Sequence, residues 1–367
     1  MPGPHIPVDS VTAAAYEIPT DQPESDGTLS WTSTVLVVVT ATAGGRRGIG
    51  YTYAGPAAVR VVDDTLAGVV TGADALTPAA SWAAMQIAVR NLGRAGVAAC
   101  AISAVDIALW DLHARLLDVP LSVALGAIHD STPVYGSGGF TSYDDRTLAA
   151  QLSDWVAAGI PRVKMKVGRD RDADPHRIRV ALDAVAGDAD LFVDANGAYG
   201  RKDALWWAEY YRGLGIPWLE EPVTSDDLAG LRLLRDRGPA GLDIAAGEYG
   251  YDLAYFHRML DAGAVDCLQA DVTRCLGYTG FLRVAALCDA RGLDLSLHCA
   301  PQASAHGGTA AWHLRHLEYF HDHVRIEAIA FDGVLTPQPG GVLKPDRGRP
   351  GHGLELRAPD LERFRVL

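Results

Sequence analysis

Five residues that can do chemistry recur along the chain at intervals of 23 to 28 residues: Asp194, Glu220, Glu248, Asp271 and His298. Each of them closes a short apolar run with the length of a buried parallel strand. The intervals match one strand-plus-helix unit, so the pattern predicts a barrel of alternating strands and helices. Because the carboxyl ends of the strands in such a barrel meet at one mouth, we expect these side chains to form an active site there.

Three of these residues are carboxylates at consecutive strand ends, Asp194, Glu220 and Glu248. Three neighbouring carboxylates would repel each other strongly without a cation between them. Oxygen ligands suit Mg²⁺, and zinc is disfavoured because no Cys or His joins the three. Any one of these acids taken alone could instead be a solvated loop residue or a helix N-cap. Because all three carboxylates lie at consecutive strand ends, the sequence predicts one bound magnesium ion.

Two lysines, Lys164 and Lys166, lie one unit earlier in the run RVKMKV. Period-two alternation places both amines on one face of a strand and Met165 on the other. Burial and a neighbouring ammonium lower the pKa of a lysine, so one lysine can take a proton while the other binds an anionic substrate. The alternative is an exposed edge strand with two solvated lysines, which the apolar residues Val163 and Val167 disfavour.

On the far side of the series, Asp271 and His298 can form a dyad. An aspartate that accepts a hydrogen bond from one imidazole nitrogen fixes the tautomer and raises the basicity of the ring. A histidine on an apolar strand can also be a satisfied core residue. Glu318, in the expected eighth strand, either hydrogen-bonds a developing oxyanion or forms a salt bridge near Arg315.

The chemistry that these groups imply is abstraction of a proton α to a carboxylate. The resulting dianion must be stabilised by a divalent ion and nearby cations. Reprotonation on the opposite face gives racemisation or epimerisation. Protonation of a departing β-hydroxyl gives dehydration instead.

Composition sets the class of protein and its surroundings. A chain of 367 residues suggests two domains, and 49% hydrophobic with 21% charged residues suits a soluble globular protein. The net charge of −13 argues against nucleic acid or an anionic membrane as partner. No apolar run is expected to reach the ~20 residues of a membrane span, and the start MPGPHIPVDS shows no secretory signal. Five cysteines without a C-x-x-C pair favour buried thiols and a cytoplasmic location.

The elements divide the chain into three parts. Residues 1–130 predict an α+β capping domain, with a hairpin over 32–55 around a Gly-Gly turn and helices around 81–93 and 101–117. Residues 131–335 predict the barrel, with a first strand at 134–140, a last strand at 316–320 and a helix over 309–317 among the helices. Residues 336–367 are expected to return to the capping domain. The fold class is therefore α/β, a modified (β/α)8 barrel of the TIM type, (β/α)7β-like, with an N-terminal cap.

The ordered motifs resemble the enolase superfamily, in its mandelate racemase-like subgroup (the mandelate racemase/muconate lactonizing enzyme family). The resemblance runs through nearly the whole chain and rests on KMK at 164–166, VDAN at 193–196, LEEP at 219–222, AGE at 246–248, QAD at 269–271, LSLH at 295–298 and the helix text of 104–126. It implies that Lys166 is the general base beside the cationic Lys164. It also implies the following roles: Mg²⁺ ligands Asp194, Glu220 and Glu248; a second acid/base, His298, backed by Asp271; and Glu318 bonded to the substrate carboxylate, with Asn196 assisting.

The resemblance also implies that two segments of the cap, Thr20 to Trp31 and Tyr51 to Pro56, close over the substrate, so Trp31 and Tyr51 are candidate contacts. The first segment, TDQPESDGTLSW, is acidic and polar. It favours dehydration of a sugar acid to a 2-keto-3-deoxy acid through an enediolate intermediate, with racemisation or epimerisation of an α-hydroxy acid second.

Two other functions are less favoured by the sequence. Cycloisomerisation is disfavoured because muconate-type relatives place a lysine where this chain has Asp271 and His298. A non-catalytic binding barrel would lack a ligand or base, and none is missing here. The family further suggests a homo-oligomer, from dimer to octamer, that takes a small carboxylate substrate.

Overall fold

The N-terminal part of the chain is an antiparallel sheet covered by helices. The structure, a computed structural model, describes residues 5–367. Its first sheet has the order β1 (Ser10–Ser25), β2 (Ser30–Ala43), β3 (Arg46–Tyr53). The helices that follow are α1 (Ala57–Val61), a π-helical turn (Val62–Leu66), α2 (Ala67–Val70), α3 (Pro78–Ala88), α4 (Val97–Leu116) and α5 (Leu121–Ala124). The predicted hairpin of β2 and β3 is present and turns at Gly44 and Gly45.

Eight parallel strands form the barrel, which confirms the predicted fold class. They are β4 (Thr132–Gly138), β5 (Arg162–Lys166), β6 (Asp190–Asp194), β7 (Trp218–Glu220), β8 (Asp243–Ala246), β9 (Cys267–Ala270), β10 (Asp294–Leu297) and β11 (Leu314–Phe320). Each strand pairs with the next, and β11 pairs with β4 to close the ring. Residues at the carboxyl ends of all eight strands therefore face one mouth.

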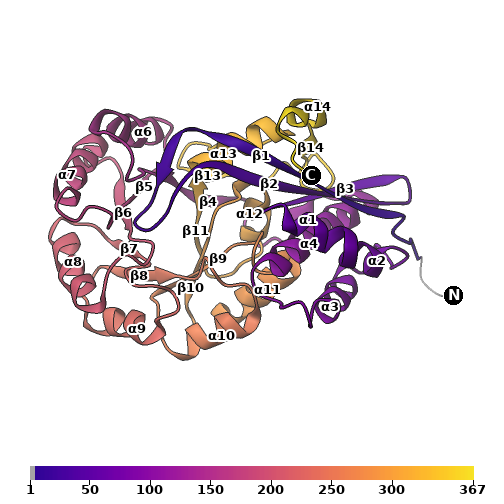
Figure 1. Cartoon of the computed structure of the whole chain (residues 1–367), viewed down its shortest axis with the longest axis horizontal. Coiled ribbons are helices and arrows are strands. Elements are labelled where there is room, and N and C mark those ends of the chain that lie inside the picture. Colours follow the sequence, from indigo (N-terminus) through magenta and orange to yellow (C-terminus); the bar gives the residue numbers. More distant parts are fainter. Residues whose placement is uncertain (1–4) are drawn as a thin grey trace.

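The barrel helices form the outer layer (Figure 1). They are α6 (Asp145–Ala157), α7 (Asp174–Val185), α8 (Arg201–Gly213), α9 (Leu228–Arg237), α10 (Leu253–Asp261), α11 (Gly277–Asp289), α12 (Pro301–Gly308) and α13 (His321–Ala330). The expectation of a helix over 309–317 is wrong, because the helix of this unit lies earlier, at α12. Its sequence, PQASAHGG, has poor helix propensity, but all eight residues are buried, so packing decides the conformation.

The tail runs back to the first sheet. It contains β12 (Phe331–Asp332), β13 (Val342–Leu343), β14 (Glu355–Leu356), α14 (Ala358–Leu361) and a 3₁₀ turn (Glu362–Phe364). Strand β13 pairs with β4, and the last residue exchanges backbone hydrogen bonds with Ala15 of β1. The tail thus contacts both the barrel and the cap.

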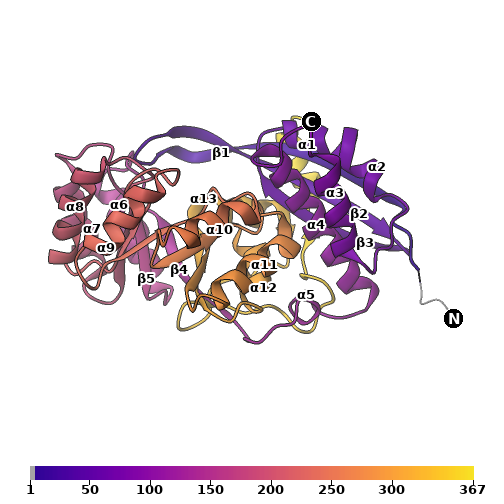
Figure 2. The same ribbon diagram turned by 90° about the horizontal axis from the view of Figure 1, so that it is seen from below.

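The long strands β1 and β2 cross from the cap over the mouth of the barrel. In both views this hairpin leaves the cap sheet and reaches the side of the barrel formed by β5 and α6 (Figures 1 and 2). Its tip, Asp26 to Leu29, is a tight turn in which the Asp26 amide donates to the Leu29 carbonyl at 3.0 Å. The cap therefore reaches over the mouth of the barrel through this hairpin.

Helix α4 is the core of the cap. It is 20 residues long, and among the described residues it is the helix that is long and apolar enough to cross a bilayer by length and composition. This differs from the expectation that no segment approaches that length. Its most apolar window is 83% buried inside the protein. The alternation of Ala, Val and Ile that raises its hydropathy is thus explained by packing against the cap sheet and α11.

The sheet and α4 approach each other so closely that β3 needs glycine. A Cβ on Gly50 would lie 2.1 Å from the carbonyl oxygen of Ala104 and 2.4 Å from the amide nitrogen of Ala108. Both neighbours are backbone atoms of α4, which a side-chain rotation cannot move. We predict that Gly50→Ala lowers the free energy of unfolding by about 1–3 kcal/mol through overpacking, measured by urea denaturation.

The matched control is Gly68→Ala on α2, where a Cβ meets nothing within 4 Å. We expect no loss of stability there. Equal free energies of unfolding for the two variants would contradict the close packing of β3 on α4.

Candidate active site

The three predicted carboxylates converge at the mouth of the barrel. Asp194 and Glu220 end β6 and β7 and are direct partners in the strand register. Glu248 follows β8 by two residues. One carboxylate oxygen of each lies within 4.8 Å of the other two, and all three side chains are buried. The structure thus brings together the residues that the sequence spacing grouped.

The local charge favours a divalent cation at this point. The carboxyl groups at the mouth are Asp194, Glu220, Glu221, Glu248, Asp271 and Glu318, and the cationic side chains are Lys164, Lys166, Arg274 and His298. The carboxyl groups thus outnumber the cationic side chains by two, and burial together with Glu248 and Asp194 raises the pKa of Glu221 well above its usual value. A further cation at this point would relieve the repulsion among the carboxylates. The donor set is oxygen only, which is the preference of Mg²⁺. The residues present therefore fit a magnesium ion held by Asp194, Glu220 and Glu248.

The two lysines of β5 point into the barrel, as the alternation predicted, while Met165 packs in the outer core. The Lys164 amine lies 2.6 Å from Glu220 and 2.8 Å from Glu318, and Lys166 lies 2.5 Å from Asp194. Burial and, to a smaller extent, the neighbouring Lys164 lower the pKa of Lys166. The carboxylate of Asp194, together with those of Glu220 and Glu318, raises it by more, so the pKa of Lys166 lies above its usual value. Lys164 is therefore a structural cation, and Lys166 is the lysine that reaches the cavity.

His298 and Asp271 form the predicted pair. The imidazole Nδ1 lies 2.8 Å from an oxygen of Asp271, whose other oxygen accepts from the amide and hydroxyl of Thr273 at 2.7 Å each. This contact leaves Nε2 facing Glu248 at 3.2 Å. Burial would lower the pKa of His298, but the Cys299 sulfur and the nearby carboxylates more than offset it, so the pKa lies well above its usual value. Nε2 is then the nitrogen that can exchange a proton.

Glu318 lies among cations inside the barrel and not beside Arg315, which pairs with Asp243 and Asp294 at the other end of the strands. Its oxygens lie 2.8 Å from Lys164 and 3.5 Å from His298, and Ser137 donates to it at 2.5 Å. Burial would raise the pKa of Glu318, but Lys164 and His298 hold it below its usual value. Glu318 is therefore an ionised hydrogen-bond acceptor at the cavity wall.

A layer of rings supports these charges from below. The inward residues two positions earlier on the strands include Phe192, Trp218 and His316, which contact one another and Tyr135 with centroid distances of 4.7–5.5 Å. The Trp218 indole donates to Glu220 at 3.1 Å. The period-two alternation of the strands thus stacks a charged layer directly on an aromatic one.

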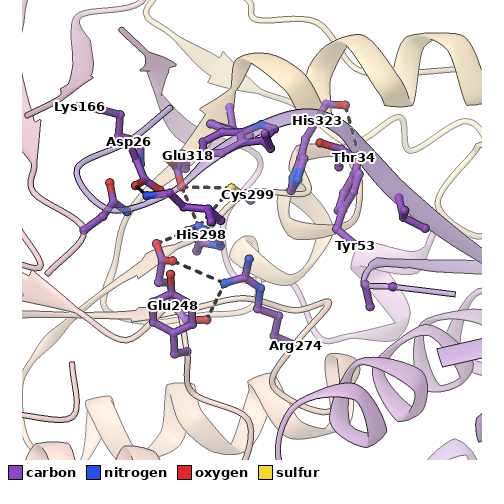
Figure 3. A pocket seen from close by; sticks show the side chains of 18 of the residues that line it. Asp26, Thr34, Tyr53, Lys166, Glu248, Arg274, His298, Cys299, Glu318 and His323 are labelled. Carbon is purple, nitrogen blue, oxygen red and sulfur yellow. Dashed lines mark hydrogen bonds and ion pairs between the residues drawn. The ribbon is translucent and has the colours of Figure 1, made fainter. Parts of the chain in front are cut away.

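The hairpin of β1 and β2 covers the resulting cavity, whose volume is about 490 Å³ (Figure 3). The tip is held by the loop after β4, where the Thr141 amide donates to Ser25, and by Arg169, which donates to the carbonyls of Asp26 and Leu29. The segment Thr20 to Trp31 lies over the cavity as expected, but it is not a loop throughout: after an irregularity between Pro19 and Glu24, residues Glu24 and Ser25 pair with Trp31 and Ser30. The Asp-Gly dipeptide at 26–27 is the sequence signal for this turn.

Of the two predicted lid contacts, Trp31 lines the cavity and Tyr51 does not. Tyr51 is fully buried, and its hydroxyl donates to Glu327 at 2.7 Å while accepting from the Ala303 amide. Its place as a possible substrate contact belongs to Tyr53, two residues along the same face of β3, which stacks on His323 at 3.4 Å. Tyr51 lies on the same face of β3 as Tyr53, but it is fully buried and does not reach the cavity.

Asn196 lies in the cavity wall as the sequence indicated. Its backbone N–H donates to the Asp194 carboxylate at 2.9 Å, and its backbone is left-handed, with φ of 46°. Glu221 and Cys299 share this strained conformation. Such strain is concentrated at functional sites, where surrounding contacts fix the backbone.

Sequence reasoning missed four residues of this site. Arg274 lies near Glu248 and Asp271 and stacks on Tyr249, and Cys299 lies 3.3 Å from both His298 and Glu318. His323 and Glu221 complete the set. Cys299 and Glu221 directly follow predicted site residues, so adjacency could have found them. Arg274 and His323 lie in loops and helices outside the strand-end pattern, and nothing in that pattern indicates them.

His323 presents a hydrogen-bond donor to the cavity. Its Nδ1 accepts from the Ala300 amide at 3.2 Å, which places the ring proton on Nε2. Burial lowers the pKa of His323 to about 3, so the ring is neutral. A neutral donor beside Tyr53 can bind a hydroxyl group without adding charge to the cavity.

Comparison with known families identifies both parts of the chain. Residues 12–126 match the N-terminal domain of the mandelate racemase / muconate lactonizing enzyme family, and residues 147–361 match the enolase C-terminal domain-like family. Among curated proteins, the 3,6-anhydro-alpha-L-galactonate cycloisomerase of Streptomyces coelicolor is 34% identical over 87% of each chain. The L-talarate/galactarate dehydratase of Salmonella typhimurium is 30% identical over 78% of this chain and 73% of its own length.

Solved structures agree with this fold. A mandelate racemase/muconate lactonizing enzyme-like protein from Rubrobacter xylanophilus has a TM-score of 0.96 and 56% identity, covering 98% of this chain and all of its own. A racemase from Streptomyces coelicolor with bound magnesium has a TM-score of 0.91 and 31% identity, with the same coverage.

The hairpin tip can dock only because residue 27 is glycine. A Cβ there would lie 2.4 Å from the carbonyl oxygen of Ala195 and 2.8 Å from that of Val167. We predict that Gly27→Ala lifts the tip off the barrel and increases the rate of proteolytic cleavage at residues 26–29 by at least about tenfold, because 1.4 kcal/mol of lost docking energy is a tenfold change in opening. The control is Gly55→Ala, where a Cβ meets nothing. If Gly27→Ala were cleaved at the same rate as the unmodified protein, this would contradict the docking of the tip on the barrel.

The buried Glu327 makes stability depend on pH. Burial raises the pKa of Glu327 to about 8, against the lowering effect of its hydrogen bonds with Tyr51 and Gln302. The folded state therefore binds more protons than the unfolded state, and the free energy of unfolding falls as pH rises from about 4.5 to about 8.

Glu327→Gln mimics the protonated carboxyl and removes this dependence. We predict that the variant gains stability relative to the unmodified protein as pH rises, reaching on the order of 3 kcal/mol at pH 8, measured by urea denaturation across that range. Glu209→Gln, on the exposed face of α8, is the control. Parallel stability curves for Glu327→Gln and the unmodified protein would refute the raised pKa.

Proposed function

Because the chain belongs to the mandelate racemase/muconate lactonizing enzyme family of the enolase superfamily, we propose that it is an acid-sugar dehydratase, a hydro-lyase that converts a sugar acid to a 2-keto-3-deoxy acid. It is an enzyme of this superfamily, and magnesium is its cofactor. We further propose Asp194, Glu220 and Glu248 as the ligands of that ion.

The observation that carries the proposal is one cavity that contains two proton-transfer groups and several separate polar groups. Lys166 comes from β5 and His298 from the end of β10, and both line the cavity. Hydrogen-bonding groups of Asn196, Arg274 and His323 are distributed around them. A polyhydroxylated acid can use each of these groups, whereas an aromatic acid would leave them unpaired at a cost in affinity.

The reaction starts at the carbon that carries the substrate carboxylate. Bound magnesium supplies the positive charge that stabilises the anion formed when the α-proton leaves. Lys166 Nζ or His298 Nε2, depending on the configuration at this carbon, takes the α-proton. The groups that raise the pKa of these bases include Asp194 beside Lys166 and Glu248 beside His298, and a cation held by the same two carboxylates would lower both pKa values and free the base. Lys164 remains protonated, opposes charging of Lys166 and contributes positive charge to the wall.

The second half of the reaction breaks the bond to the β-oxygen. The group that did not take the α-proton donates a proton to the departing hydroxyl, which leaves as water. The resulting enol takes a proton at the β-carbon, releases its hydroxyl proton to water and becomes the 2-keto-3-deoxy acid. Asp271 holds Nδ1 of His298 in place throughout, so Nε2 is the nitrogen that gives and takes protons.

The same first step supports two other outcomes. Return of a proton to the opposite face of the α-carbon gives epimerisation, for which the pair of Lys166 and His298 is also suited. In a 3,6-anhydro acid, the oxygen β to the carboxylate is part of a ring, so its elimination opens the ring and yields an isomer. The similarity to a cycloisomerase therefore concerns the leaving group and not the bases, and it strengthens an alternative that the sequence placed last.

The surroundings of the enzyme are also proposals. All five cysteines are buried and unpaired, which supports a reducing, cytoplasmic location. The exposed Ile87 and Leu92 on and after α3, and Trp312 beyond α12, support a homo-oligomer.

Incubation with a library of sugar acids tests the function. We expect magnesium-dependent formation of a 2-keto acid, detected with semicarbazide, and exchange of the α-proton in D₂O that EDTA abolishes. Exchange without keto-acid but with a change in optical rotation would identify epimerisation instead. The absence of exchange across mono- and dicarboxylic sugar acids would refute the proposal.

Substitution of each base tests the roles of Lys166 and His298. We predict that Lys166→Ala and His298→Asn each lower kcat by about 10²–10⁴-fold, with the secondary structure of the folded protein retained in circular dichroism. The control Lys202→Ala removes an exposed lysine at the start of α8 and should keep full activity. Full activity of Lys166→Ala on an identified substrate would show that this lysine is not the base.

A further inference from the structure

A second group of metal-ligand side chains lies where the long hairpin crosses the rim of the barrel. It consists of Asp21 and Glu24 on β1 and His321 at the start of α13, and we call it the hinge cluster. One ligand atom of each residue lies within 4.8 Å of the other two. The His321 Nε2 is 3.0 Å from an oxygen of Asp21. The cluster is separate from the three carboxylates of the active site and shares no residue with them.

Glu24 is the unusual member of this cluster. It is only 1% exposed, yet no residue of the described chain hydrogen-bonds its Oε1. Its other oxygen accepts from the Trp31 indole at 2.8 Å. A buried carboxylate oxygen without a partner is costly, so this atom calls for a donor or a cation.

The charges around Glu24 do not supply that cation. Asp21 and Asp322 are the nearby acids. The arginine of this region, Arg325, donates through one terminal nitrogen to Asp322 at 2.6 Å and to the Pro19 carbonyl at 2.7 Å, and its buried Nε has no hydrogen-bond partner among the described residues. In the described chain neither Asp21 nor Glu24 has an ion pair with a lysine or arginine, and the ion pairs of this region are Asp21 with His321 and Asp322 with Arg325.

We propose that the hinge cluster binds a divalent transition-metal ion of the zinc class, with Asp21, Glu24 and His321 as ligands. One imidazole nitrogen and two carboxylates suit Zn²⁺, which accepts mixed nitrogen and oxygen ligands and completes its shell with water. This distinguishes the cluster from the oxygen-only active site, which suits Mg²⁺. Asp21 and His321 are partly exposed and line a surface hollow beside Tyr143, which gives an ion a route to the cluster.

The ion would join the hairpin to the barrel. Asp21 and Glu24 lie just before the hairpin tip, in the stretch where the pairing register of β1 and β2 shifts. His321 directly follows β11, the strand that carries Glu318. Because Glu24 also holds Trp31, which lines the active-site cavity, occupancy of the cluster fixes one wall of that cavity.

Zinc binding to the full-length protein tests this inference. With the active site saturated with magnesium, we expect calorimetric titration and metal analysis after dialysis to show zinc bound at the cluster. Glu24→Gln and His321→Ala should each lose one equivalent of zinc per chain. Any zinc that enters the active site persists in both variants, so the difference reports the cluster alone.

The matched control is His176→Ala. His176 pairs with Asp145 at 2.7 Å on the barrel surface, but both residues are exposed and this pair is not among the metal-ligand groups of the described chain. We expect its zinc stoichiometry to be unchanged. Cobalt gives a second readout, because Co²⁺ at a four-coordinate site should produce visible absorption bands that both cluster variants lose.

Two results would overturn the inference: no zinc bound beyond the active site in the unmodified protein, or equal stoichiometry in the unmodified protein and in His321→Ala. His321 is partly exposed at the start of α13, so this variant should fold even if Glu24→Gln does not. Neither readout depends on catalysis, so the result is separate from that for the proposed function.

Discussion

The excess of buried negative charge at the mouth of the barrel is the constraint on which the rest of the site depends. Six carboxyl groups meet there, and burial alone would neutralise most of them by raising their pKa. Two lysines on one strand, an arginine after β9 and a histidine after β10 form ion pairs with these carboxyl groups. The three carboxylates Asp194, Glu220 and Glu248 lie close enough together to bind a divalent ion. Each of these positive charges also has a place in the proposed chemistry. The electrostatics that allow this cluster to be buried are thus the same electrostatics that stabilise a carbanion.

The barrel can hold these charges in place because its strands stack them on a rigid base. On β6, β7 and β11, the inward residue two positions before the charged one lies in the layer below, where the rings of Phe192, Trp218 and His316 fill the interior. The indole of Trp218 both packs in this layer and donates to Glu220. A change of one residue in register would exchange these layers with the outer core. Geometry at the mouth is therefore set by backbone pairing, which is much stiffer than loops.

The difference between residues placed by strand pairing and residues placed by loops and packing explains how much of the fold and the site the sequence predicts. The barrel, the cap and the convergence of the strand-end residues follow from short apolar runs that each end in a charge. The segment TDQPESDGTLSW has no strand-like alternation and therefore predicts a loop, but its residues Glu24 and Ser25 pair with β2, and this pairing outweighs their low strand propensity. Helix α12 was missed for the same reason, since PQASAHGG is helical only within its packed surroundings. Tyr51 and Tyr53 share one face of β3, and only the three-dimensional depth of the cavity separates them. Arg274 and His323 reach the site from outside the strand pattern, so no local rule could find them.

The groups that carry out the first chemical step and the groups that select the substrate come from different parts of the fold. Proton abstraction uses groups on strands, and these are fixed by the barrel itself. The remaining wall of the cavity comes from the hairpin, from β3 and from α13, through Trp31, Tyr53 and His323. Among the described residues, Trp31, Tyr53 and His323 have no hydrogen bond or ion pair with Asp194, Glu220 or Glu248, so they can change without disturbing the charge balance at the mouth. A different hydrogen-bond pattern on this wall would select a different β-oxygen as leaving group, or none. Relatives of this chain include dehydratases, a cycloisomerase and an epimerase, and we expect the specificity of this chain to depend on the wall that the cap and α13 supply together.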